Sequence, residues 1–208
     1  MKKWIWIGLG IAALGAFLAW LFVESSKPLP GTKIADLGTE HVPVGTKVEY
    51  NSDPPTSGKH YGEWIRSGVY ETPKEDGYLV HSLEHGYVIM SYNCEKRVVS
   101  RQSSVVSIVY AHGTEEEEAT SSAGEATESG MLSEAFRSDE CHKLVDQLIS
   151  IYEKKGKTRI IVLPRPNLDT RIALTAWDYI DKFNDFDEQR ITSFIDAHLN
   201  QGPEKTME

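Results

Sequence analysis

Four of the seven histidines, His41, His60, His81 and His85, fall in a loop-rich stretch near the start of the sequence. Imidazole suits zinc, copper, iron and nickel as a ligand, and it also serves as an acid or base near neutral pH. An ordered but irregular backbone can hold several such rings in one place. The first chemistry that the sequence indicates is therefore transition-metal binding by these histidines.

The closest pair, His81 and His85, has the spacing H-x-x-x-H. On a helical turn this places both rings on one face as i and i+4 neighbours, where they can share one ion. The metalloprotease pattern H-E-x-x-H needs a glutamate directly after the first histidine. Ser82 holds that position and Glu84 precedes the second histidine, which argues against a metalloprotease. The same spacing also occurs on the polar face of ordinary helices.

The remaining candidate ligands are weaker. Met90 follows in a predicted strand, where a thioether is a soft ligand that favours copper but is more often a core residue. His112, His142 and His198 are expected to be solvated, the first in an acidic segment and the others on helices. The alternative for the whole cluster is that its rings only hydrogen-bond the backbone and form a scaffold without a ligand.

Local patterns predict the elements that must position these side chains. Residue types favour strands at 48–50, 87–92, 105–110, 159–163 and 171–176. Residues 51–58, rich in Pro, Gly and Asx, predict a loop of fixed shape. One helix is expected from an N-cap at Ser138 to Gly156, and another after the capping-box-like sequence 185–188, ending at 202–203. The predicted fold class is α+β, a small mixed β-sheet with helices packed on one face, after a loop-rich N-terminal third.

The first 23 residues predict a transmembrane anchor. Residues 4–23 contain no charged side chain, and their length matches the ~20 residues that cross a hydrocarbon core. Lys2 and Lys3 predict a cytoplasmic N-terminus, with the rest outside the cell membrane. A cleaved signal peptide is the alternative, but its apolar region is usually shorter and ends at small residues. Residues 24–33 are expected to be a linker and 34–204 the extracytoplasmic domain.

Charge and cysteine content narrow the function further. Beyond the predicted anchor lie 31 acidic and 20 basic residues, a formal net charge of −11, which argues against nucleic acid and anionic lipid as partners. The acidic segment 112–131 has almost no apolar side chains and is expected to be a disordered insertion. Two cysteines, Cys94 and Cys141, favour a disulfide in an oxidising compartment, although two separate buried thiols are the alternative.

Two motifs, residues 54–60 (PPTSGKH) and 79–86 (LVHSLEHG), closely resemble the bacterial DUF3105 family, a domain of unknown function. Residues 176–177 and 202–204 also resemble the end of that family, so the resemblance covers roughly 38–204. It implies that a set of five residues occupies motif positions: His41, His60, His81, Glu84 and His85. The acidic insertion departs from the family, whose shorter link implies that Cys94 and Cys141 lie close together.

Three hypotheses for function follow. The leading one is a non-catalytic, membrane-anchored module that binds copper or zinc through the histidines and Glu84. The second is a metal-dependent enzyme in which three histidines hold the ion, water takes an open position and Glu84 is the base. The third is an envelope scaffold or adaptor without a ligand, whose acidic loop docks a protein partner.

Overall fold

The computed structural model describes residues 2–25, 28–96 and 132–205. The chain divides into two compact units, Met1–Pro30 and Gly31–Glu208. The first unit contains helix α1, Lys2–Ser25. Among the described residues, no helix is both long enough and apolar enough to cross a membrane. The transmembrane span stays a prediction from the sequence.

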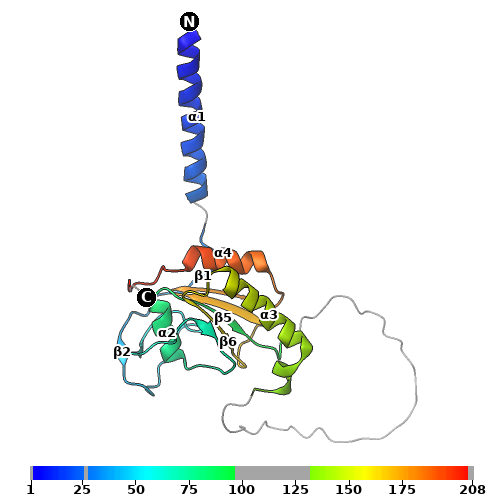
Figure 1. Cartoon of the computed structure of the whole chain (residues 1–208). Helices are drawn as coiled ribbons and strands as arrows, with labels where there is room; N and C mark the ends of the chain where they lie inside the picture. The colour runs from blue at the N-terminus through cyan, green and yellow to red at the C-terminus, as the bar shows by residue number, and fades with distance from the viewer. Residues whose placement is uncertain (1, 26–27, 97–131, 206–208) are drawn as a thin grey trace, which may run out of the picture. The chain divides into compact units, whose positions relative to one another are not determined.

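A six-stranded mixed sheet is the centre of the second unit (Figure 1). Its strands, in the order β1-β8-β7-β5-β6-β4, are Thr32–Lys33 (β1), Tyr179–Phe183 (β8), Ile172–Ala176 (β7), Val88–Tyr92 (β5), Ile160–Pro164 (β6) and Gly68–Val69 (β4). β6 pairs in parallel with β5 and β4, whereas the other neighbours are antiparallel. A separate parallel pair joins β2, His41–Val42, to β3, His60–Tyr61. The predicted α+β class with a mixed sheet is confirmed.

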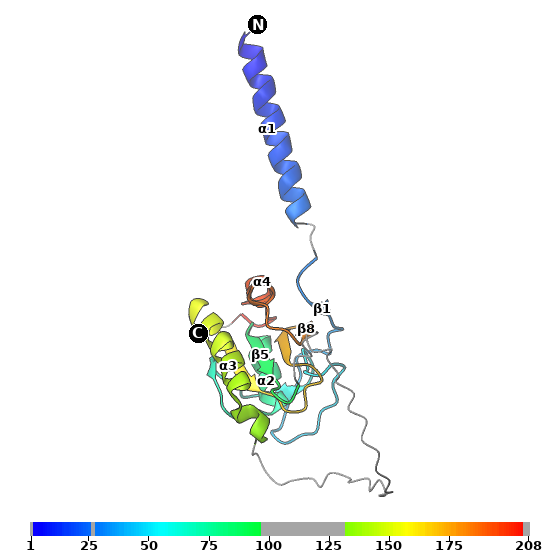
Figure 2. The same ribbon diagram turned by 90° about the vertical axis from the view of Figure 1, so that its right-hand side faces the viewer.

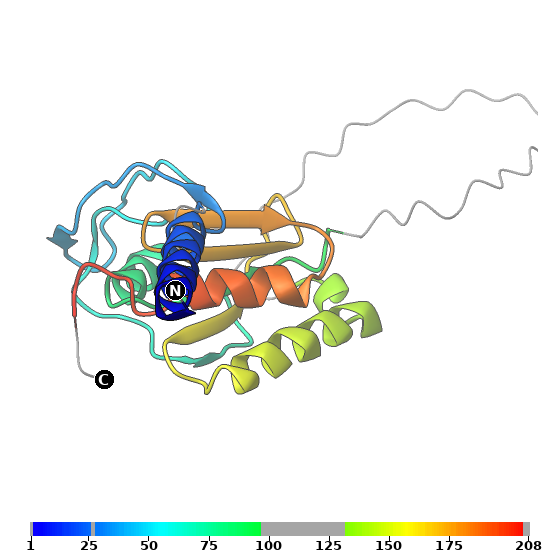
Figure 3. The same ribbon diagram turned by 90° about the horizontal axis from the view of Figure 1, so that it is seen from above.

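Helices cover both faces of the sheet, so the prediction that they pack on one face is wrong. They are α2 (Asp76–Glu84), α3 (Asp139–Lys154), α4 (Glu188–His198) and the short 3₁₀ helix η1 (Glu134–Arg137). Figures 1, 2 and 3 show α3 and α4 as neighbours, and both pack on the face that carries Val88 and Met90. α2 packs on the other face, where Leu83 meets Ile89 and Ile161. All five residues of β5 and of β6 are buried, and because strand side chains alternate, both faces need cover.

The helix ends follow from local chemistry. α3 begins as predicted, because the Ser138 hydroxyl accepts a hydrogen bond from the Cys141 amide at 3.2 Å. The cap of α4 is Asp187, whose carboxylate accepts from the Arg190 amide at 2.9 Å, and not Asp185 as the capping-box pattern implied. The predicted start at Asp185 is therefore two residues too early, because the sequence pattern allows either aspartate to cap the helix.

Some predictions fail or fall outside the described residues. Residues 48–50 belong to no strand, because this segment runs into the loop that precedes β3. His198 is 3 % exposed, contrary to the prediction, and its ring centre lies 4.3 Å from that of Tyr179 and 4.5 Å from that of Phe194. Helical periodicity turns His198 toward the sheet together with the apolar residues of α4. The acidic segment 112–131, His112 and the strand predicted at 105–110 lie outside the described residues.

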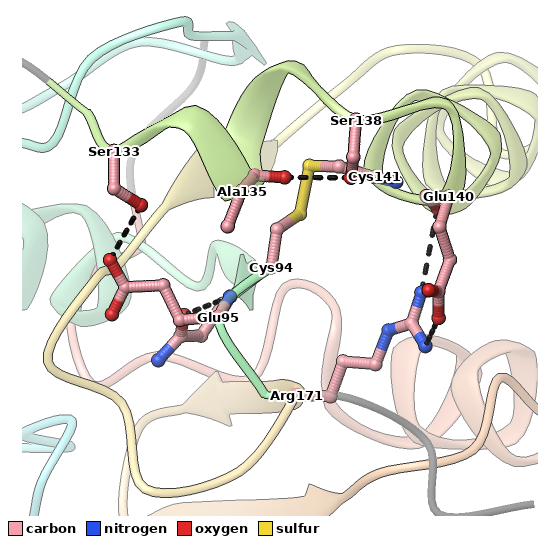
Figure 4. The surroundings of a disulfide bond; sticks show 9 residues. Cys94, Glu95, Ser133, Ala135, Ser138, Glu140, Cys141 and Arg171 are labelled. Carbon is pink, nitrogen blue, oxygen red and sulfur yellow. Dashed lines mark hydrogen bonds and ion pairs between the residues drawn. A yellow bond between two sulfur atoms is a disulfide. The ribbon is translucent and has the colours of Figure 1, made fainter.

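The two cysteines form a disulfide, as predicted. Cys94 lies two residues after the end of β5, and Cys141 lies in the first turn of α3. Their Cα atoms are 5.4 Å apart. Figure 4 shows η1 beside the bond, with the Ser133 hydroxyl donating to Glu95 at 2.7 Å. Nearby, Arg171 pairs with Glu140. The disulfide thus ties the first turn of α3 to the end of the central strand.

Candidate metal centre

His41 and His60 are brought side by side by the parallel pairing of β2 with β3. The strand register places His41 opposite His60, and the His60 amide donates to the Glu40 carbonyl at 3.1 Å. The preceding loop ends at Gly58, which has a φ of 119° and whose amide donates to the Gly38 carbonyl at 3.0 Å. Only glycine adopts such a φ readily, which accounts for the glycine two positions before His60. The fixed loop therefore delivers His60 to the site.

Helix α2 supplies the other half of the site. His81 and Glu84 lie on its last turn, and His85 is its C-cap residue. The ring centres of His81 and His85 are 4.6 Å apart, as the i, i+4 spacing predicts. α2 packs against β3, and the Nδ1 atom of His81 lies 2.6 Å from the Tyr61 carbonyl oxygen. The strand that carries His60 and the helix that carries His81 are thereby fixed to one another.

The side chains gather into two groups of potential ligands. His41, His60, His81 and Glu84, called here the inner group, offer donor atoms that all lie within 4.8 Å of one another. His81, His85 and Glu204, called the outer group, meet the same limit. His81 belongs to both groups. The five residues expected from the sequence are therefore all present, distributed over two groups that share one ring.

Donor spacings in the inner group suit a small cation. The Nε2 atom of His60 lies 2.9 Å from Oε2 of Glu84, and Nε2 of His41 lies 3.7 Å from the same oxygen. Ligands held at about 2.0–2.1 Å around a tetrahedral zinc ion are about 3.3 Å apart. The observed spacings bracket that value. The spacings of these three donors are therefore compatible with one metal ion.

Hydrogen bonds to carbonyl groups set the tautomers of two rings. The Nδ1 atoms of His60 and His81 lie 2.7 Å from the Gly58 carbonyl oxygen and 2.6 Å from that of Tyr61. Because a carbonyl oxygen can only accept, both Nδ1 atoms carry the proton and both Nε2 atoms of the neutral rings carry a lone pair. Metal-binding histidines have the same arrangement, with the second ring nitrogen bonded to a carbonyl or carboxylate.

The lone pair of His60 faces another acceptor, because its Nε2 lies 2.9 Å from Oε2 of Glu84. Nε2 of His81 lies 3.0 Å from Nε2 of His85, which donates a hydrogen bond to it when the His85 proton is on Nε2. The two acceptors of His60 and Glu84 repel one another unless a proton or a metal ion lies between them. The inner group is therefore built to hold positive charge.

Burial strengthens this electrostatic demand. His60 is fully buried, and His81, Glu84 and His85 are 3–6 % exposed, whereas the His41 side chain is 53 % exposed. Burial lowers the pKa of His81, against the opposing effect of its hydrogen bond to Tyr61. A lowered pKa keeps the ring neutral and its lone pair available to an ion at neutral pH. His41 leaves the inner group open to solvent on one side.

Glu204 is the ligand candidate that residue-type reasoning missed. It follows Gly202, which packs so closely on the end of α2 that a Cβ at this position would overlap the Glu84 carbonyl oxygen. The Glu204 amide donates to that same carbonyl at 3.1 Å, and its carboxylate lies 3.2 Å from Nε2 of His85. The signal was available, because residues 202–204 and 79–86 both resemble DUF3105 in the sequence.

Trp64 lies beside the histidines, whereas Met90 and His142 lie away from them. The Trp64 ring centre lies 4.6 Å from that of His85 and 5.4 Å from that of His81, so its indole lies against the histidines rather than only in the core. Met90 is fully buried on the opposite face of the sheet, among α3 and α4 side chains. The alternative of Met90 as a soft ligand is excluded by that placement. His142 is exposed on α3 and joins neither group.

Comparison with known proteins identifies the family. One family profile matches residues 41–121 and 102–208, and its description is "protein of unknown function (DUF3105)". These stretches together cover well over half of the chain. The chain belongs to DUF3105. The resemblance predicted from the two histidine motifs is thus confirmed, and the range matched to DUF3105 contains every member of the inner and outer groups. No curated protein and no solved structure matches this DUF3105 chain.

Proposed function

We propose that this DUF3105 domain binds one zinc or copper ion at the inner group and that it does so without catalysing a reaction. The observation that carries the proposal is the convergence of lone pairs. Carbonyl groups hold the protons of His60 and His81 on Nδ1, so both Nε2 lone pairs point into the buried group, and that of His60 faces the Glu84 carboxylate. A bound dication would satisfy both lone pairs and the Glu84 carboxylate at once.

The donor set supports zinc or divalent copper. All members of both groups offer nitrogen or oxygen atoms. Imidazole with carboxylate suits Zn²⁺ and Cu²⁺, whereas thiolate and thioether ligands select Cu⁺. The two cysteines are joined in the disulfide, and Met90 lies on the other side of the sheet. The domain is accordingly proposed to bind Zn²⁺ or Cu²⁺ and not Cu⁺.

A binding role agrees better with the position of Glu84 than an enzymatic one. A hydrolytic site needs a carboxylate that activates water without being a ligand. Oε2 of Glu84 instead lies between the Nε2 atoms of His60 and His41, at 2.9 and 3.7 Å. That is the place of a fourth ligand, and four protein ligands typify zinc sites that hold the ion rather than use it.

The proposed location is the outer side of the cell membrane, with the N-terminal helix as the anchor. Residues 4–23 are free of charge and follow Lys2 and Lys3, which motivates this topology. The disulfide agrees with it, because such bonds persist in oxidising compartments.

Metal loading of the full-length chain, purified without a histidine tag, tests the proposed function. After treatment with a chelator and dialysis against Zn²⁺ or Cu²⁺, elemental analysis should find one ion per chain. His81→Ala should weaken binding by more than the ~10–100-fold that loss of an outer-shell partner costs. His142→Ala is the matched control, since this histidine is exposed on α3. Failure of the wild-type chain to bind either ion, or equal loss in both variants, would reject the proposal.

A further inference from the structure

The two groups compete for one lone pair. His81 belongs to both, and its Nδ1 proton is committed to the Tyr61 carbonyl at 2.6 Å. Only Nε2 remains, and one imidazole lone pair coordinates one ion. Two ions that shared it would each lie about 2.0–2.1 Å from Nε2, hence within about 4 Å of one another. At that separation two dications repel strongly in a buried site.

Resting on the proposed function, we propose that the inner and outer groups are two alternative positions of a single ion, and that His81 holds the ion while it moves between them. The ion exchanges His41, His60 and Glu84 for His85 and Glu204, without any change in its charge. His81 stays bound throughout. The outer group is the handover position through which the ion reaches the inner one and leaves it.

The number and burial of the donors favour binding of the ion at the inner group over the outer group. The inner group has four potential donors, of which three are buried. The outer group has three, and the Glu204 side chain is 49 % exposed. Four donors hold an ion better than three, and the third donor of the outer group can turn to solvent. The ion therefore rests in the inner group and passes only briefly through the outer one.

Distances support a continuous path. Nε2 of His81 and Nε2 of His85 are 3.0 Å apart, and Nε2 of His85 lies 3.2 Å from the Glu204 carboxylate. Each step thus spans about the edge of one coordination tetrahedron, about 3.3 Å. An ion can gain an outer ligand before it loses an inner one, which avoids the cost of a bare ion in a buried place. Glu204 adds the negative charge that makes the outer position attractive to a cation.

Equilibrium affinity and exchange rate separate these roles. The experiment uses the full-length chain loaded with Zn²⁺ alone, and measures the dissociation constant and the rate of transfer to an excess of a coloured chelator. Glu204→Gln should leave the dissociation constant within about threefold but slow the transfer roughly tenfold. His41→Gln should raise the dissociation constant without slowing the transfer, because His41 is a ligand of the resting position. Glu40→Gln, an exposed charge-matched change beside the site, should alter neither.

The inference and the proposed function fail in different ways. If the wild-type chain binds no Zn²⁺, the proposed function itself is wrong. If it binds one ion and Glu204→Gln leaves the transfer rate unchanged, the ion leaves past His41 and does not pass through the outer group. If Glu204→Gln raises the dissociation constant tenfold, Glu204 is an ordinary ligand of one position. Binding of two ions per chain would refute the claim that the inner and outer groups are alternative positions of one ion.

Discussion

At the scale of single residues, backbone carbonyl groups decide the chemistry of the site. Imidazole presents either nitrogen to an ion, and the ring alone does not select one. In this chain the Gly58 and Tyr61 carbonyl oxygens accept from Nδ1 of His60 and His81 and leave Nε2 for a ligand. Burial then keeps His81 neutral by lowering its pKa. The residues were readable from the sequence, but the atoms were not.

Asp178 offers a prediction that does not involve the metal. Its φ of 62° places it in the turn between β7 and β8, and its buried Oδ1 has no hydrogen-bond partner among the described residues. Burial first, and then Asp36, raise its pKa, against a hydrogen bond from Ser57. A raised native pKa means that the ionised carboxylate costs stability above that pKa, and that the cost disappears below the unfolded pKa of about 4.

Asp178→Asn should therefore increase the free energy of unfolding at pH 7, by up to about 1 kcal/mol. Asparagine tolerates the same φ and can still accept from Ser57. The gain should shrink toward zero as the pH falls below about 4. Urea unfolding at both pH values measures it, with the exposed Asp185→Asn as control. A gain that is independent of pH would contradict the explanation from charge.

At the scale of elements, the site depends on how segments end. α2 ends at Glu84, and the chain after α4 returns to that end, where the Asn200 amide donates to the Gly86 carbonyl at 2.8 Å. Gly86 and Gly202 allow this approach because neither has a side chain to intervene. The return of the chain is what brings Glu204 to His85.

Gly202→Ala should lower the free energy of unfolding by about 1–3 kcal/mol, the usual cost of overpacking. Its Cβ would overlap the Glu84 carbonyl oxygen and the Gly86 amide nitrogen, which are backbone atoms and cannot turn away. Chemical denaturation of both variants measures the effect. Gly62→Ala is the matched control, since a Cβ there meets nothing within 4 Å, and it should change stability by less than about 0.5 kcal/mol. Equal effects at the two glycines would show that the close approach is unimportant.

The start of α3 gives a second prediction at this scale. Removal of the Ser138 hydroxyl leaves the Cys141 amide without its cap acceptor, so Ser138→Ala should cost about 1 kcal/mol of stability. Ser133→Ala provides the comparison, because the Ser133 hydroxyl caps no amide and contacts exposed Glu95. Thermal unfolding should separate the two variants, and a smaller loss for Ser138→Ala than for Ser133→Ala would refute the capping role.

At the scale of the whole molecule, the disulfide closes a large loop. Cys94 and Cys141 are 47 residues apart, so by the chain-entropy estimate the bond contributes ~4 kcal/mol through the unfolded state. Reduction should therefore shift the denaturant midpoint of the wild-type chain downward. A Cys94→Ala, Cys141→Ala double variant should start from the lower midpoint and stay unchanged on reduction. An unchanged midpoint of the wild-type chain on reduction would be contrary to this expectation.

The proposed orientation is tested at the same scale. A reporter that is active only outside the cytoplasm, fused after Glu208, should be active if Lys2 and Lys3 stay inside and residues 4–23 span the membrane. A reporter active only in the cytoplasm serves as the counterpart. Activity of the second and silence of the first would overturn the topology.

The sequence by itself determined the local features of this protein. Helical periodicity gave α3, and β-forming residues gave β5, β6 and β7. The two motifs gave the family and four of the six potential ligands, and the family resemblance added His41. These signals succeed because each depends on neighbours in the chain. β8 was missed, since Asp181 and Lys182 interrupt its apolar pattern, and Asp181 is buried there because Arg190 of α4 pairs with it.

Only the tertiary structure decided which atoms meet. His60 reaches Glu84 because β3 packs on α2, Glu204 reaches His85 because the chain returns over Gly202, and α2 covers the second face of the sheet. All five residues of β5 and of β6 are buried, so both faces of the sheet need cover, whereas the sequence had led to a prediction of helices on one face only. Residue patterns constrain each segment separately, whereas a ligand group is set by contacts between segments far apart in the chain.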